Sequence, residues 1–282
     1  MTVKFFCRDG ECVLSATHLP VSVGRDEQYV SDFAEAGNGD AATGIRDRAR
    51  MWNFVAQNPQ ALNLICCLYS DRGTIAGYQS MDSYIPPMLW TNKKGEQFYV
   101  RCVWIAKQRR APLTRLESEE LSGSDPDALA RDLVNSISRG ENVQYEFNAQ
   151  IITPQDTGNL EFDPADPTFA WPTDRFPLMP IGLLTLNRLT ENFENQVKNA
   201  EMSPYALVEG ISFALPVRPP ADGLEIAGES LRAMTEEEAH VLAGNLAEEI
   251  SHLSPDLMEK ILVMFTKADL AFGRVLTSIL GG

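Results

Sequence analysis

The run FPLMPIGLLTLNR at residues 176–188 gives the clearest indication of the fold. Its second half, residues 183–187, is apolar between polar neighbours, which is typical of a strand. The preceding residues, 154–181, are rich in proline and aspartate, which disfavour regular structure. We therefore expect an ordered surface wrap that connects a strand at residues 143–153 to the strand at 183–187.

The rest of the chain supplies further strands. The other expected strands are residues 2–8, 12–15, 77–84, 88–91 and 97–104. The first two flank the turn Asp9-Gly10-Glu11, which is typical of a hairpin. Within residues 97–104 side chains alternate, with Cys102 and Trp104 on one face and Val103 on the other. These short strands predict an antiparallel β-core.

Helices are expected both between the strands and at the C-terminal end. Their ranges are residues 27–35, 47–56, 60–69, 125–137 with Asp125 as cap, 235–252, and one that starts at Ser254-Pro255. Thr235 and Glu238 have the spacing of a capping box. The expected organisation is a β domain at residues 1–213, a connector at 214–230 that is rich in proline and glycine, and a C-terminal helical part at 231–282.

Composition excludes several classes of partner. The chain carries 24 basic and 39 acidic residues, a net charge of −15, which disfavours nucleic acid and anionic membranes as partners. Five cysteines without a CxxC motif predict reduced thiols and, together with the lack of a recognisable signal peptide, a cytoplasmic protein. Three histidines without ligand spacing to cysteines predict no metal site.

A series of motifs, in collinear order, extends over most of the chain. They are VKFF at residues 3–6, the segment LYSDRGTIAGY at 68–78, MDSY at 81–84, ITP at 152–154, WP at 171–172, the run at 176–188, NF at 192–193, GI at 210–211, MTEEE at 234–238 and FTKAD at 265–269. Together they resemble the haem catalases. The resemblance implies an α+β fold, an incomplete catalase-like antiparallel β-barrel of about six strands with C-terminal α-helices.

The same resemblance locates departures at the haem site. Catalases carry a distal histidine on the first barrel strand, and this chain starts at about the third strand, so we expect no counterpart. The position of the distal asparagine is Thr17, beside His18. The positions of three haem-stacking phenylalanines are Ser22, Val23 and Val30. The proximal Arg-x-x-x-Tyr motif, which should follow residues 210–211, does not occur.

These departures bear on the cofactor. A tyrosinate ligand needs a cation nearby, because an unperturbed tyrosine titrates near ~10. Splitting peroxide also needs a distal base. We therefore expect no cofactor and no catalase activity, with haem as the alternative.

Four residues remain as candidates for a site. His18 could act as a base or metal ligand near the old distal pocket, with Thr17 beside it, but a surface polar residue at a strand end is favoured. Arg25 could bind a ligand with Asp26, but a structural pair is favoured. Tyr84 could replace the axial ligand, but a core aromatic is favoured.

Three hypotheses follow, in decreasing weight. The first is a haem-free binding or interaction scaffold that assembles with itself or with another subunit. The second is a repurposed small-molecule enzyme that uses the open barrel, and the third a haem-dependent peroxide oxidoreductase with a non-standard ligand. Because residues 2–8 should form an edge strand, we also expect a second copy or residues 214–230 to cover it.

Overall fold

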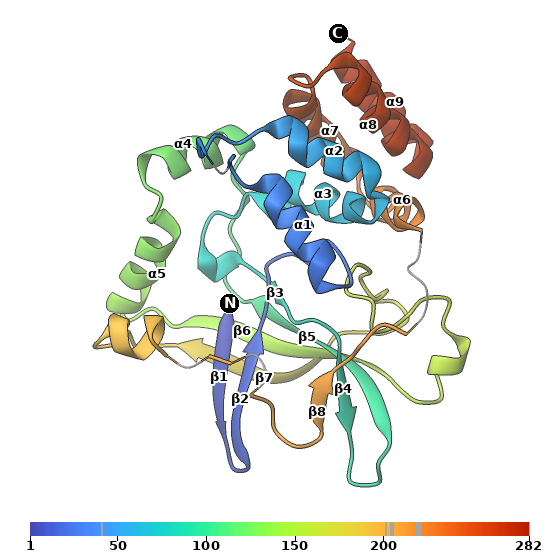
Figure 1. Ribbon diagram of the computed structural model, residues 1–282. Coiled ribbons are helices and arrows are strands. Elements are labelled where there is room, and N and C mark those ends of the chain that lie inside the picture. The colour runs from blue at the N-terminus through green and yellow to red at the C-terminus, as the bar shows by residue number, and fades with distance from the viewer. Residues whose placement is uncertain (41, 201, 204–205, 218–221, 282) are drawn as a thin grey trace. The chain divides into compact units, whose positions relative to one another are not determined.

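The computed structural model describes residues 1–40, 42–200, 202–203, 206–217 and 222–281 (Figure 1). They form two compact units, each interrupted in sequence. Unit 1 contains Met1–Pro20, Thr74–Ala165 and Trp171–Val217, and unit 2 contains Val21–Gly73, Asp166–Ala170 and Arg218–Gly282. The expected division at residues 213 and 231 followed the chain in order, whereas the two units exchange segments.

Unit 1 holds two antiparallel sheets. A hairpin of β1 (Thr2–Cys7) and β2 (Gly10–Ser15) forms the first. Six strands form the second, which runs in the order β7-β6-β5-β4-β8, with β3 also paired to β5. Their bounds are β3 (Ser83–Tyr84), β4 (Met88–Thr91), β5 (Gln97–Ala106), β6 (Val143–Ile152), β7 (Met179–Leu186) and β8 (Ile211–Phe213). Among the described residues the strands close no barrel, as expected for an incomplete one.

The core of unit 1 follows from the alternation in β5. Cys102 and Trp104 are buried, and the ring of Trp104 stacks on Phe147 with centroids 4.0 Å apart. Phe5 of the hairpin stacks on the same indole at 6.1 Å. Burial of these large rings provides much of the apolar stabilisation that holds the hairpin against the larger sheet.

Two strand predictions need correction. Residues 77–84 form a short 3-10 helix, η3 (Tyr78–Ser80), before the two-residue strand β3. The hydroxyl of Tyr145 donates to the Tyr78 carbonyl at 2.6 Å, and Ser80 Oγ donates to the Gly77 carbonyl at 2.9 Å. These side-chain contacts hold the segment in a turn, so it cannot add a long strand. β7 also starts earlier than expected, inside the predicted wrap.

The two helices of unit 1 also differ from expectation. Helix α4 (Arg115–Ser124) was not expected, although Thr114 and Glu117 form a full capping box. Helix α5 (Ala128–Ser138) begins three residues later than predicted, after Asp127. The carboxylate of Asp125, the expected cap, accepts from the Asp127 amide and from the Arg131 guanidinium instead. Local hydrogen bonds in the turn therefore delay the helix.

Unit 2 is helical. Its helices are α1 (Glu27–Gly37), α2 (Arg48–Gln57), α3 (Leu62–Tyr69), α6 (Gly223–Arg232), α7 (Glu236–Ile250), α8 (Pro255–Ala268) and α9 (Leu270–Leu280). The capping box of Thr235 and Glu238 starts α7 as predicted. Helix α6 occupies the second half of the expected connector, because Asp222 caps it and Ile226, Ala227 and Leu231 bury its inner face. In the described part of the chain, no helix has the length and apolarity to cross a membrane.

Close packing of α6 on the end of α8 gives a first prediction. A Cβ atom at Gly228 would lie 2.2 Å from the Ala268 carbonyl oxygen, whereas one at Gly244 in α7 would meet nothing within 4 Å. We expect Gly228→Ala to lower the free energy of unfolding by about 2 kcal/mol, because backbone must move. Gly244→Ala should raise it by about 0.5–1 kcal/mol through helix propensity. Urea denaturation of both variants checks the opposite signs, and equal effects would contradict the packing.

Candidate functional site

Thr17 and Tyr84 are brought together through their backbones. The Thr17 amide donates to the Tyr84 carbonyl at 3.0 Å, and the Tyr84 amide donates to the Thr17 carbonyl at 2.6 Å. Tyr84 also lies opposite Val103 on β5, so this bridge attaches residue 17 to the large sheet of unit 1. The Thr17 hydroxyl donates to the Leu19 carbonyl at 3.0 Å. Both residues thus help to hold the chain where it leaves β2.

The same region contains a buried cation, Arg101, which the sequence interpretation missed. Arg101 lies on the face of β5 that carries Val103, so it is a diagonal neighbour of Tyr84. Its side chain belongs to a residue that is only 4% exposed, and its guanidinium donates to the Pro20 carbonyl. Burial lowers the pKa of Arg101 to about 10, and the charge interaction with Tyr84 opposes that shift. The signal in the sequence was a single arginine within the otherwise uncharged stretch 97–106.

His18 is half-buried next to this contact. Desolvation lowers the pKa of its imidazole below the ordinary value, and the positive N-terminal ammonium lowers it further. That ammonium group donates to the Ala16 carbonyl at 2.7 Å. His18 is therefore a neutral imidazole at pH 7, which is the form that could accept a proton.

Arg25 belongs to unit 2 and pairs with a residue that was not expected. Its Nε lies 3.2 Å from Oδ2 of Asp166, and the two side chains are 12% and 4% exposed. Asp26, the expected partner, instead accepts from the Tyr29 amide at 2.8 Å and caps α1. The favoured structural role of Arg25 agrees with this pair, but the partner was wrong.

The positions that correspond to haem-stacking phenylalanines also lie in unit 2. Val23 is 5% exposed, and Val30 is exposed on α1. The Ser22 amide donates to the Pro167 carbonyl at 2.8 Å. These side chains present neither an aromatic face nor a metal ligand.

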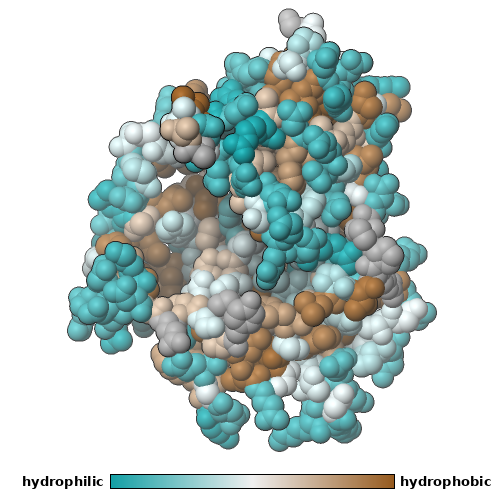
Figure 2. Space-filling view, in the orientation of Figure 1, coloured by the Kyte–Doolittle hydropathy of each residue, from teal (hydrophilic) through white to brown (hydrophobic). Residues whose placement is uncertain are grey.

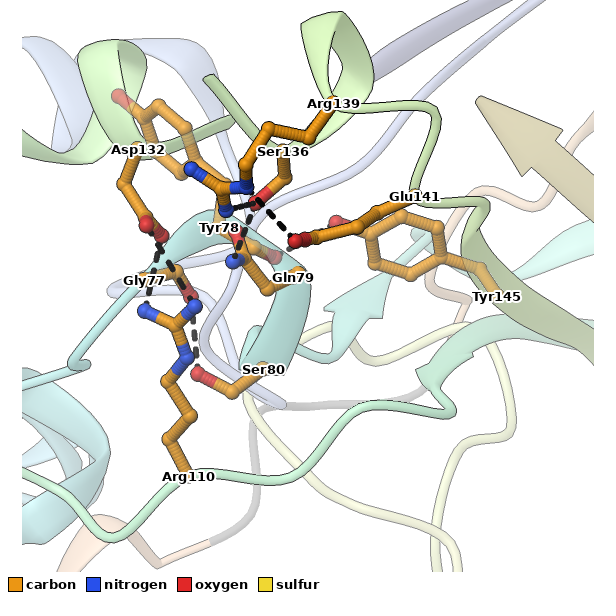
Figure 3. Close-up of polar contacts among 10 residues, drawn as sticks. All are labelled: Gly77, Tyr78, Gln79, Ser80, Arg110, Asp132, Ser136, Arg139, Glu141 and Tyr145. Atoms are coloured by element: carbon orange, nitrogen blue, oxygen red, sulfur yellow. Dashed lines mark hydrogen bonds and ion pairs between the residues drawn. The ribbon is translucent and has the colours of Figure 1, made fainter. Parts of the chain in front are cut away.

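A second polar cluster joins η3 to α5 in unit 1 (Figure 3). Ser136 is fully buried, and its Oγ accepts from Gln79 at 3.4 Å and from Arg139 at 3.2 Å. Arg139 also donates to Glu141 at 2.8 Å, and a hydrogen bond from Ser136 to Glu141 is the main cause, after Arg139, of the lowered pKa of that carboxyl. Every side chain in this cluster fixes another one, which is the pattern of a structural network.

Two cavities are present within the units. One, of about 340 Å³, lies in unit 1 between the β4–β5 hairpin and Pro154. The other, of about 550 Å³, lies in unit 2 between α2, the start of α6, and α8. None of the four candidate residues lines either cavity. The described residues also contain no group of three or more His, Cys, Asp or Glu that could hold a metal ion.

Comparison with known proteins gives a consistent result. The family model for catalase matches residues 1–215. A catalase of Methanosarcina barkeri is 37% identical over 213 residues, which are 75% of this chain and 42% of that protein. A bromoperoxidase-catalase of Streptomyces venezuelae is 32% identical over 210 residues, 74% of this chain and 44% of its own length. The chain thus spans less than half the length of these curated relatives.

Solved structures extend the similarity in fold to the C-terminal helices. Catalase A of Saccharomyces cerevisiae matches 99% of this chain and 77% of its own, with a TM-score of 0.90 and 20% identity. A bacterial catalase matches 98% of this chain and 74% of its own, with a TM-score of 0.92 and 18% identity. Because the family model covers well over half of the residues and the whole fold agrees, the chain belongs to the catalase family.

Proposed function

We propose that this catalase-family protein binds no haem, has no catalase activity and acts as a binding or assembly protein. The family implies a haem held by a tyrosine that a neighbouring cation keeps deprotonated. In the described residues Tyr84 has such a neighbour, Arg101, but that guanidinium is buried and already donates to the Pro20 carbonyl. At two of the stacking positions Val23 is packed away, and Val30 offers no ring. The residues present therefore do not fit the family's haem arrangement.

The use of Thr17, Tyr84 and Arg101 as mutual backbone and charge contacts is the observation that supports this proposal most. Each group that could serve as ligand or acid–base residue already stabilises the junction after β2. His18 is the remaining base, and a single neutral imidazole cannot replace a stacked aromatic pair, a distal base and an axial ligand together.

A spectroscopic experiment tests the proposal. The 282-residue chain is expressed with excess haem precursor and purified beside the Methanosarcina barkeri catalase as a positive control. We expect the control alone to show a stoichiometric Soret band and rapid oxygen release from peroxide. A stoichiometric Soret band in this chain, or one that grows to one equivalent when haemin is titrated in, would overturn the proposal.

The contact between Tyr84 and Arg101 favours one second candidate, a haem-dependent peroxide oxidoreductase with Tyr84 as ligand. It corrects the expectation that no cation lies near this tyrosine. If the chain does bind haem, Tyr84→Phe should abolish or strongly shift the Soret band, and the matched change Tyr99→Phe in β5 should leave it unaltered. A band unaffected by Tyr84→Phe rejects this candidate.

A further inference from the structure

Strand β7 ends the large sheet with one edge unpaired by any described strand. In the described part of the chain it pairs with β6 alone, and a bulge at Phe147/Asn148 interrupts that ladder. Its first five residues, Met179 to Leu183, are all exposed. Exposed faces and a free edge in the same segment leave apolar side chains and backbone groups accessible together (Figure 1).

The chemistry of this edge is unusual for one that stays bare. Met179, Ile181 and Leu183 are 42%, 49% and 58% exposed. No charged side chain lies between Arg175 and Arg188, whereas proteins usually place charges on open edges to prevent pairing. Only Pro180 limits hydrogen bonding along the strand. Uncharged apolar edges of this kind are either covered or prone to aggregation.

The exposed apolar surface continues beyond β7. The next segment, which includes the short π-helix η5 (Glu194–Lys198), exposes Leu189, Phe193 and Val197. With the side chains of β7, these offer roughly 500–600 Å² of apolar area, which approaches the ~800 Å² that each partner buries in a standard interface.

The other free edge, β1, is less suited to docking. Lys4 and Arg8 lie on or next to it, and Lys4 forms an ion pair with Glu11 of β2 at 2.7 Å. Brown, apolar atoms also lie over the strands in the lower part of Figure 2, where Leu215 and Val217 follow β8. Those two residues extend no sheet edge, so β7 combines features that neither of these surfaces has.

We propose that a second copy of this chain pairs antiparallel with β7 across a twofold axis near Ile181. In this register Met179 faces Leu183 of the second copy, so the three exposed apolar residues meet one another. Arg188 faces Asp174 of the second copy, so each end of the strand pair gains opposite charges. The edge is self-complementary, as a twofold interface requires. Two copies that each carry −15 would also meet where the strand itself is uncharged.

This inference goes beyond the proposed function and is independent of whether haem binds. It moves the expected self-association from β1, where the sequence suggested it, to β7. Residues 214–230, the alternative cover for β1, do not pair with that strand in their described part, where residue 214 instead donates to Pro87.

Sedimentation equilibrium of the whole chain at about 10 µM tests the interface. We expect a dimer for the unaltered protein. Ile181→Lys should weaken dimerisation by about 100-fold or more, because it brings two ammonium groups together at the axis. Val263→Lys on α8, where the valine is 45% exposed, is the matched control and should leave the dimer intact. Circular dichroism establishes that each variant is folded.

A charge-swap series tests the register. Asp174→Arg should weaken the dimer, and Asp174→Arg combined with Arg188→Asp should restore it. A monomer at ten times the test concentration, or a dimer that resists Ile181→Lys, would overturn the proposal. A dimer lost with Phe6→Lys but kept with Ile181→Lys would place the contact at β1 and also reject it. Neither result bears on the Soret test, so the two proposals can fail separately.

Discussion

Trp104→Ala is expected to lower the free energy of unfolding by about 4 kcal/mol, among the largest effects of any single substitution in this chain. The Trp104 side chain is 2% exposed and stacks on Phe147 and Phe5, so its removal leaves a cavity between hairpin and sheet. Chemical denaturation, with a linear extrapolation to zero denaturant, measures the loss.

Trp104→Phe provides the matched control for this cavity. The indole Nε1 is buried and has no hydrogen-bond partner among the described residues. Phenylalanine keeps a stacked ring and removes that polar group, so the cost should be about 1 kcal/mol. Equal losses for the alanine and phenylalanine variants would mean that stacking at Trp104 does not hold the two sheets together.

Arg101→Ala is expected to lower the free energy of unfolding by about 3 kcal/mol. The substitution opens a cavity at a residue that is 4% exposed and leaves the Pro20 carbonyl without its donor. The pKa of about 10 keeps the guanidinium charged at pH 7, so the loss should be visible in urea denaturation at neutral pH.

Arg101→Met separates packing from charge. Methionine fills much of the same volume and removes a buried charge whose desolvation is unfavourable, so the cost should stay below about 1.5 kcal/mol. If Arg101→Met were as destabilising as Arg101→Ala, the hydrogen bond to Pro20 would dominate. If neither variant lost stability, the guanidinium would not hold the junction after β2.

Short-range patterns in the sequence determined the family, most of the elements and the helix starts. The motif order from residue 3 to residue 269 indicates the catalase fold, and the spacing of Thr235 and Glu238 locates the start of α7. Alternation within residues 97–104 identifies β5 and its buried face. Such signals succeed because capping and side-chain periodicity act between residues a few positions apart.

Tertiary structure alone decided what the candidate residues touch. Arg25 pairs with Asp166 rather than with its neighbour Asp26, and Arg101 reaches a carbonyl 81 positions away in the chain. The exposed edge of β7 was equally hidden, because its leucines read as a buried strand. Partner choice and strand order depend on how distant segments are brought together, and the energy of a local pattern does not encode that geometry.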